Sequence, residues 1–289
     1  PFFSATIMAA VIAGALAYSE GKFSWLYLFS AIFIIAGSNC GINLINDYFD
    51  HKSKNDELNK YFGPFSGGSR VIQDKLIKPR SILIVGITSF VIVSLVGLYF
   101  VIFVNLHLLW FGLAAVVLGY FYTATPLKLG YRGPGEILVF IKSGPLAVCG
   151  TYLLFTGSIS LEAILISIPQ GLLITAILYI NEFPDYEADK LANKRHIIVR
   201  IGREKARIFY AILIMAIYLS VLIPVILRLV PVYLLVIFIT LPLAIQAIST
   251  ALKNYDNERA IIPAQAKTIL LTLSSGIVIT GGYIADKFI

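Results

Sequence analysis

Two short acidic stretches carry the residues best able to do chemistry. The first is NDYFD, residues 46 to 50, and the second is NEFPDYEADK, residues 181 to 190. Both begin with the same five-residue pattern: an amide, an acid and an aromatic residue, then a variable position, then an aspartate. Asp47 and Asp50 are three positions apart, and Asp185 and Asp189 are four apart, so each pair would point into one shared space from a helix end.

Carboxylates gathered in this way repel one another unless a cation joins them. A set of oxygen ligands without Cys or His at matching spacing favours Mg²⁺ over Zn²⁺. Because Mg²⁺ is usually held by one or two carboxylates together with substrate phosphates, two such clusters could clamp a diphosphate. A single aspartate at a membrane helix end is more often an interfacial cap, but two matched clusters favour a site.

Basic residues lie in the same predicted layer and could bind the remaining phosphate charge. These candidates are Arg70, Lys128, Arg132, Lys190 and Lys194. The preference of cytoplasmic loops for Lys and Arg explains many of them without any site. Lys128 and Arg70 are the stronger candidates because of the motifs around them.

The composition indicates which elements position these residues. Hydrophobic residues make up 58% of the chain and charged residues only 13%, which is typical of a polytopic membrane protein. A membrane-spanning helix needs about 20 mostly apolar residues. Nine ranges qualify, at residues 2 to 18, 25 to 46, 80 to 104, 106 to 123, 134 to 157, 161 to 183, 205 to 228, 231 to 252 and 261 to 284. The runs are too long and uninterrupted for barrel strands, so we expect an all-α bundle forming one domain, residues 1 to 289.

Lys and Arg concentrate in the second, fourth and sixth connections, which predicts that these face the cytoplasm. The net charge of +7 is thereby explained without nucleic acid. Two of these connections, residues 46 to 79 and 181 to 202, are predicted to be long loops that carry the function. No secretory signal is evident in the first span, and we expect that residues preceding Pro1 have been removed.

The cysteines and histidines show no ligand-like spacing. Cys40 and Cys149 are interpreted as small core residues. His51, His107 and His196 are expected to be surface or interface groups rather than catalytic ones.

The pairing of NDYFD with DYEAD on a helical membrane bundle resembles the UbiA superfamily of intramembrane prenyltransferases, whose two motifs have the forms NDxxD and DxxxD. Together with YTATPLKLGYRGPGE and DYEADKLANKRHIIVRIG, it is most similar to the 1,4-dihydroxy-2-naphthoate polyprenyltransferase branch of menaquinone synthesis. Many relatives carry a further aspartate where this chain has Lys54, and here the acid comes at Asp56.

The resemblance implies that Mg²⁺ held by the four motif aspartates binds the diphosphate of a polyprenyl donor, while Arg70 and Lys128 neutralise the leaving group. The further substrate-binding residues that it implies are Asn43, Asn46, Asn181, Tyr122, Arg132, Lys190, Lys194 and Asp56. Aromatic side chains such as Tyr48, Phe49, Tyr120, Tyr122 and Tyr179 could stabilise the allylic cation, although in a membrane helix they more often only pack.

The acceptor is expected to be a small aromatic quinone precursor, with a glycerol-phosphate ether lipid as the alternative. A transporter of anionic lipids is the alternative from another class. Transporters usually carry ionisable groups near the midplane on broken helices, whereas the acidic clusters of this chain are predicted at one face of the bundle.

Overall fold

The computed structural model describes residues 3 to 53, 57, 59, 63 to 124 and 126 to 288, and this part of the chain contains helices and no strand. The α-helices are α1 (Phe3–Ser19), α2 (Trp25–Lys52), α4 (Pro79–Phe103), α5 (Leu108–Phe121), α6 (Gly135–Ile141), α7 (Ala147–Thr156), α8 (Leu161–Leu191), α9 (Ile197–Ile201), α10 (Arg203–Ile226), α11 (Leu241–Asn254) and α12 (Ile262–Asp286). Short 3₁₀ segments are η1 (Leu129–Tyr131) and η3 (Val232–Thr240), and η2 (Lys142–Leu146) is a π-helical turn.

The prediction of an all-α membrane bundle is confirmed. Seven helical stretches in the described residues are long and apolar enough to cross a membrane. The remaining two predicted spans correspond to α1 and α5, which are apolar but have only 17 and 14 residues. Nine full-length spans are therefore not confirmed, although each predicted range lies on helical structure.

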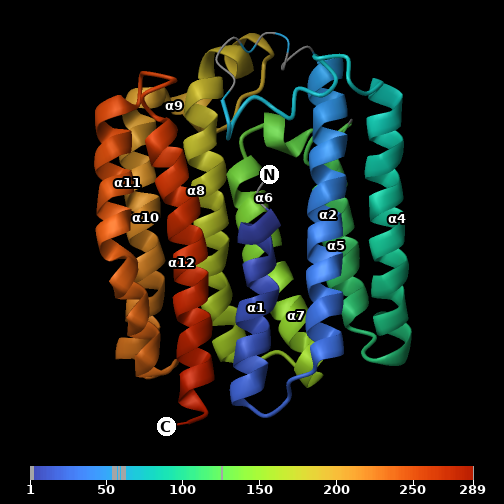
Figure 1. Cartoon of the computed structure of the whole chain (residues 1–289), viewed down its shortest axis with the longest axis vertical. Helices are drawn as coiled ribbons and strands as arrows, with labels where there is room; N and C mark the ends of the chain where they lie inside the picture. The colour runs from blue at the N-terminus through green and yellow to red at the C-terminus, as the bar shows by residue number, and fades with distance from the viewer. Residues whose placement is uncertain (1–2, 54–56, 58, 60–62, 125, 289) are drawn as a thin grey trace.

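The two acidic stretches lie on helices, which corrects the prediction that they begin long loops. α2 continues through Lys52 and α8 through Leu191, past the predicted ends at residues 46 and 183. The apolar pattern ends before each helix does, because the side chains of the last helical turns are polar and face one another. The backbone hydrogen bonds of the helix continue through these turns. As Figure 1 shows, the ends of α2 and α8 lie at the same end of the bundle, and the connections that follow them cross it there.

One predicted span, residues 134 to 157, is built from α6, η2 and α7. Pro145 lacks a backbone N–H, and the chain accommodates it in the π-helical turn. The neighbouring Gly144 packs directly on α8, because a Cβ there would lie 2.4 Å from the carbonyl oxygen of Ser167. This close approach holds η2 against α8.

Candidate functional site

Lys194 joins the two acidic stretches. Its Nζ lies 3.9 Å from Asp50 Oδ2 on α2 and 3.6 Å from Asp189 Oδ1 on α8. Burial alone would lower the pKa of Lys194, but the carboxylates of Asp189 and Asp50 outweigh it and hold that pKa well above its ordinary value. The ammonium is therefore charged at neutral pH. The structure thus brings Asp50 and Asp189 into one cluster, as the matched pattern predicted.

The connection between α2 and α4 covers the other two aspartates. Ser69 Oγ donates a hydrogen bond of 2.5 Å to Asp47 Oδ2. Asn59 Nδ2 donates one of 2.7 Å to Asp185 Oδ1, and the backbone N–H of Gly67 also donates to Asp185. Because one connection contacts both helices, it closes the aspartate cluster from the open end of the bundle.

Tyr131 is a member of the site that the sequence did not single out. Its hydroxyl donates to Asp50 Oδ1 and lies 3.1 Å from Ser53 Oγ. Burial and the nearby Asp50 carboxylate both raise the pKa of Tyr131, so the phenol keeps its proton and remains a donor. The only available signal was its place in YTATPLKLGYRGPGE, the segment that supports the family resemblance.

Several predicted substrate-binding residues lie in the same layer. Asn46 Nδ2 donates to Asp50 Oδ2 at 3.1 Å. The side-chain oxygens of Asn46 and Asn181 are buried and accept no hydrogen bond within the described structure. Lys128 Nζ lies 5.2 Å from the centroid of the Tyr131 ring, the same ring that Lys194 approaches.

Two other predicted residues, Arg132 and Lys190, contact groups outside the aspartate cluster. Arg132 is exposed and donates to the carbonyl of Pro126, and Lys190 is exposed above the Tyr186 ring. Arg70 is half-buried in the α2–α4 connection with a left-handed backbone (φ 63°). Asn43 is half-buried one turn below Asp47 on α2, and Asp56 lies outside the described residues. The roles assigned to all these residues stay predictions.

Tyr122 is held against the short segment that contains Tyr131. The backbone N–H of Gly130 donates to the Tyr122 carbonyl at 2.8 Å, and a Cβ on Gly130 would lie 2.9 Å from Tyr122 Cζ. Tyr122 also interacts electrostatically with Glu182, Lys194 and Asp50. Gly130 therefore sets the position of a ring at the base of the aspartate cluster.

Gly130→Ala is expected to destabilise the protein by about 1–3 kcal/mol, because the added methyl must displace the Tyr122 ring. Thermal unfolding in detergent would measure the loss. Gly281→Ala in α12 is the matched control, since a Cβ there meets no atom within 4 Å and alanine favours a helix. Equal melting temperatures for the two variants would contradict the assigned contact.

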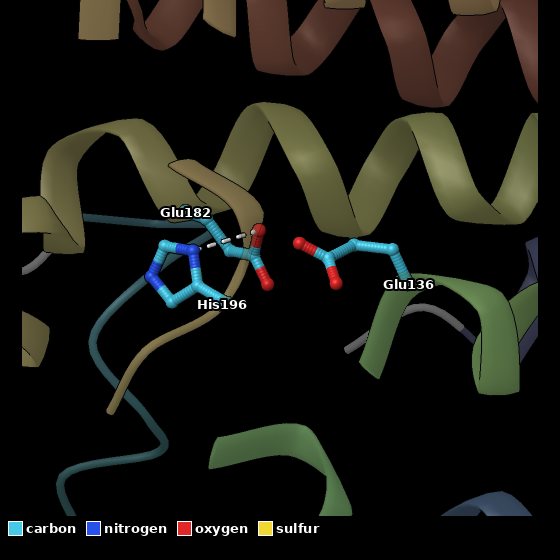
Figure 2. A group of neighbouring side chains, drawn as sticks. All are labelled: Glu136, Glu182 and His196. Atoms are coloured by element: carbon cyan, nitrogen blue, oxygen red, sulfur yellow. Dashed lines mark ion pairs between the residues drawn. The ribbon is translucent and has the colours of Figure 1, made fainter. Parts of the chain in front are cut away.

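A second polar cluster lies beside the aspartates and consists of Glu136, Glu182 and His196 (Figure 2). His196 Nε2 is 2.9 Å from Asp189 Oδ2, and Nδ1 is 3.3 Å from Glu182 Oε2. Glu136 Oε1 accepts the backbone N–H of Ile197 at 2.8 Å. His196 is fully buried, so the expectation of a surface or interface group was wrong. Buried carboxylates from two helices surround it, which no local sequence pattern reveals.

The oxygen-rich aspartate cluster fits Mg²⁺. Four carboxylates from two helix ends and the unpaired amide oxygens of Asn46 and Asn181 are the hard donors that this ion prefers. The ligand atoms of Glu136, Glu182 and His196 lie within 4.8 Å of one another and could also hold a cation. That second set includes an imidazole nitrogen, a ligand less typical of Mg²⁺.

A family model described as the UbiA prenyltransferase family matches residues 7–271. The chain belongs to the UbiA prenyltransferase family. The match confirms the resemblance described above. Together with the seven apolar helical stretches, it identifies the protein as a membrane-embedded prenyltransferase. The likeness extends across most of the chain, including both acidic stretches.

The curated relatives of this UbiA protein include a 1,4-dihydroxy-2-naphthoate octaprenyltransferase of Bacillus subtilis, which is 27% identical over 87% of the chain and 79% of the relative. A 2-carboxy-1,4-naphthoquinone phytyltransferase of Synechocystis is 27% identical over 98% of the chain and 90% of the relative. A solved UbiA homolog from Archaeoglobus fulgidus, bound to GPP and Mg²⁺, has the same fold. Its TM-score is 0.61 at 15% identity, over 96% of this chain and 99% of that one.

Proposed function

We propose that this UbiA-family prenyltransferase moves an isoprenoid chain from a polyprenyl diphosphate to a small aromatic acceptor of the dihydroxynaphthoate type. The observation that carries the proposal is the convergence of Asp50 and Asp189 on Lys194, because it joins two acidic helix ends into one site. The naphthoate relative from B. subtilis and the GPP and Mg²⁺ bound by the A. fulgidus homolog support it.

In this proposal Asp47, Asp50, Asp185 and Asp189 would hold Mg²⁺, which when bound offsets the negative charge of the donor diphosphate. The chain adds fixed positive charge through Lys194, and Lys128 also lies near the Tyr131 ring. Preorganised cations aimed at a leaving group act strongly in a site that excludes water. The α2–α4 connection, which carries Asn59, Gly67 and Ser69, would exclude water from this end of the site.

The reaction breaks the bond between the first prenyl carbon and the diphosphate oxygen, and the electron pair leaves with the diphosphate. A carbon of the electron-rich acceptor ring then attacks the allylic cation and forms the new C–C bond, after which the ring loses one proton. The ring of Tyr122, at the base of the aspartate cluster, could stabilise the cation by about 1 kcal/mol.

A cavity of about 460 Å³ below the site offers room for the first part of the isoprenoid chain beside the acceptor. It is bounded by α1, α2, α4, α5, η2 and α7, and its lining is mostly apolar. Leu98 of α4 and Leu113 of α5 line it, and both side chains are nearly half exposed. The tail could therefore pass into lipid between α4 and α5.

The Lys and Arg distribution supports a cytoplasmic position for the aspartate end.

Purified protein in detergent should form product from labelled geranylgeranyl diphosphate and 1,4-dihydroxy-2-naphthoate, and should release diphosphate only when Mg²⁺ is present. No ion gradient is needed, which separates an enzyme from a transporter. A parallel reaction with a geranylgeranylated glycerol phosphate tests the alternative acceptor. Product with the lipid alone would replace the proposed acceptor, and no diphosphate release with either acceptor would overturn the proposal.

A further inference from the structure

Among the described residues that line the apolar cavity below the aspartates, Lys142 is the only charged one. It lies in η2, within the stretch Gly135–Thr156 that is long and apolar enough to span a membrane. Among the described residues, its ammonium group has no hydrogen bond, ion pair or ring contact. A charged side chain at such a depth is costly and usually has a partner or a function.

The local fold turns Lys142 into the cavity. Gly144 packs against α8 on one side of η2, while Lys142, Leu146 and Gly150 follow one another at four-residue intervals and all line the cavity. This spacing places the three on one face of the α6–η2–α7 segment. The direction of Lys142 is therefore fixed by backbone packing rather than by a side-chain partner.

A polar stripe on α2 connects this cavity with the aspartate cluster. Asn39 lines the cavity, and Asn43, Asn46 and Asp50 follow it at spacings of four, three and four residues. Such spacings place the four side chains along one face of the helix. With a rise of 1.5 Å per residue, the levels of Asn39 and Asp47 are about 12 Å apart. That separation suits a two-ring molecule whose far end reaches the cavity while a ring carbon lies just below the aspartates.

We propose that Lys142 binds the carboxylate of a small aromatic acid and so orients this acceptor for prenyl transfer. The inference rests on the proposed function and assigns the group that selects the acceptor. The cavity volume of about 460 Å³ is in the usual range for small-ligand sites. Its walls include Phe100 and Phe111, which suit an aromatic ring.

One ammonium in an apolar surrounding matches one carboxylate charge better than a doubly charged phosphate, so a glycerol-phosphate lipid is the less suitable ligand. The names of the B. subtilis and Synechocystis relatives, a naphthoate and a carboxynaphthoquinone transferase, agree with an acidic two-ring acceptor.

Binding without donor and without Mg²⁺ tests this assignment. Titration calorimetry in detergent compares 1-hydroxy-2-naphthoate with 1-naphthol, which lacks the carboxylate. The wild-type protein should bind the acid at least about tenfold more tightly, a difference of about 1.4 kcal/mol. Lys142→Met should lose this preference while still binding 1-naphthol, and Lys142→Arg should keep part of it. Lys267→Met is the matched control, because Lys267 bonds Thr250 on α11 and does not line the cavity.

The stability of the variants adds a second readout. Removing an unpaired ammonium from the bundle should leave the melting temperature of Lys142→Met equal to or above that of the wild type. Lys142→Gln repeats the binding comparison with a neutral polar side chain. Equal affinity of the wild type for the two ligands, or an undiminished preference in both Lys142→Met and Lys142→Gln, would overturn the assignment. Tighter Lys142-dependent binding of a glycerol-phosphate lipid would also overturn it.

The proposed function and this inference can fail separately. Because the titrations contain no donor, a preference for the acid that depends on Lys142 stands even if prenyl transfer is not observed. Conversely, transfer to a naphthoate that is unaffected by Lys142→Met would leave the proposed function intact and remove the role of Lys142.

Discussion

Asp47→Ala and Asp185→Ala should each lower prenyl transfer by about 10³-fold or more, equivalent to about 4 kcal/mol of transition-state stabilisation. Each change removes one of the two carboxylates at a different helix end, so that end would be left with a single carboxylate to hold Mg²⁺ and, through it, the diphosphate. The covering connection would also loosen, since Ser69 and Asn59 lose the acceptors of their hydrogen bonds.

The rate of diphosphate release at saturating donor and acceptor measures this effect, with thermal unfolding to establish that the variants fold. Asp74→Ala is the matched control, because Asp74 is exposed on the same α2–α4 connection. Its rate should equal that of the wild type. If Asp47→Ala and Asp185→Ala both retained full activity, the two helix ends could not form the proposed clamp.

The sequence predicted the bundle and the aspartate cluster because both depend on local patterns. Long apolar runs require helices in a bilayer, and repeated acids at helical spacing require a common partner. The ends of α2 and α8 were placed too early, since hydropathy marks where side chains become polar and not where helical hydrogen bonds stop. Asp50 and Asp189 therefore lie on ordered helices rather than on loops.

Relations between distant residues were harder to predict. Lys194 was a candidate only for phosphate binding, and nothing in its surroundings indicated that it would lie between Asp50 and Asp189. His196 has no ligand-like spacing and is expected to be a surface or interface group, yet Glu136 and Glu182 from two other segments lie against it (Figure 2). Such burial results from helix packing, which the spacing of residues within one segment does not report.

Lys194→Met should lower both stability and activity, because it leaves two buried carboxylates without the cation between them. Breaking a buried ion pair typically costs about 3 kcal/mol or more, so the melting temperature in detergent should fall by several degrees. Transfer should fall by about 10²-fold through loss of the fixed charge beside the leaving group. Lys194→Arg, which keeps the charge, should lose less stability and less activity than Lys194→Met.

The pH dependence of this stability difference follows from the raised pKa of Lys194. A group whose pKa is higher in the folded protein contributes its full stabilisation below its unfolded-state pKa, about 10.4, and loses it only as the pH rises through the folded-state value. The difference in melting temperature between wild type and Lys194→Met should therefore stay constant from about pH 7 to 9. Lys253→Met, at an exposed position near the end of α11, should melt like the wild type. A difference that disappeared between about pH 7 and 8 would mean that Lys194 is not held as a charged bridge between the two helix ends.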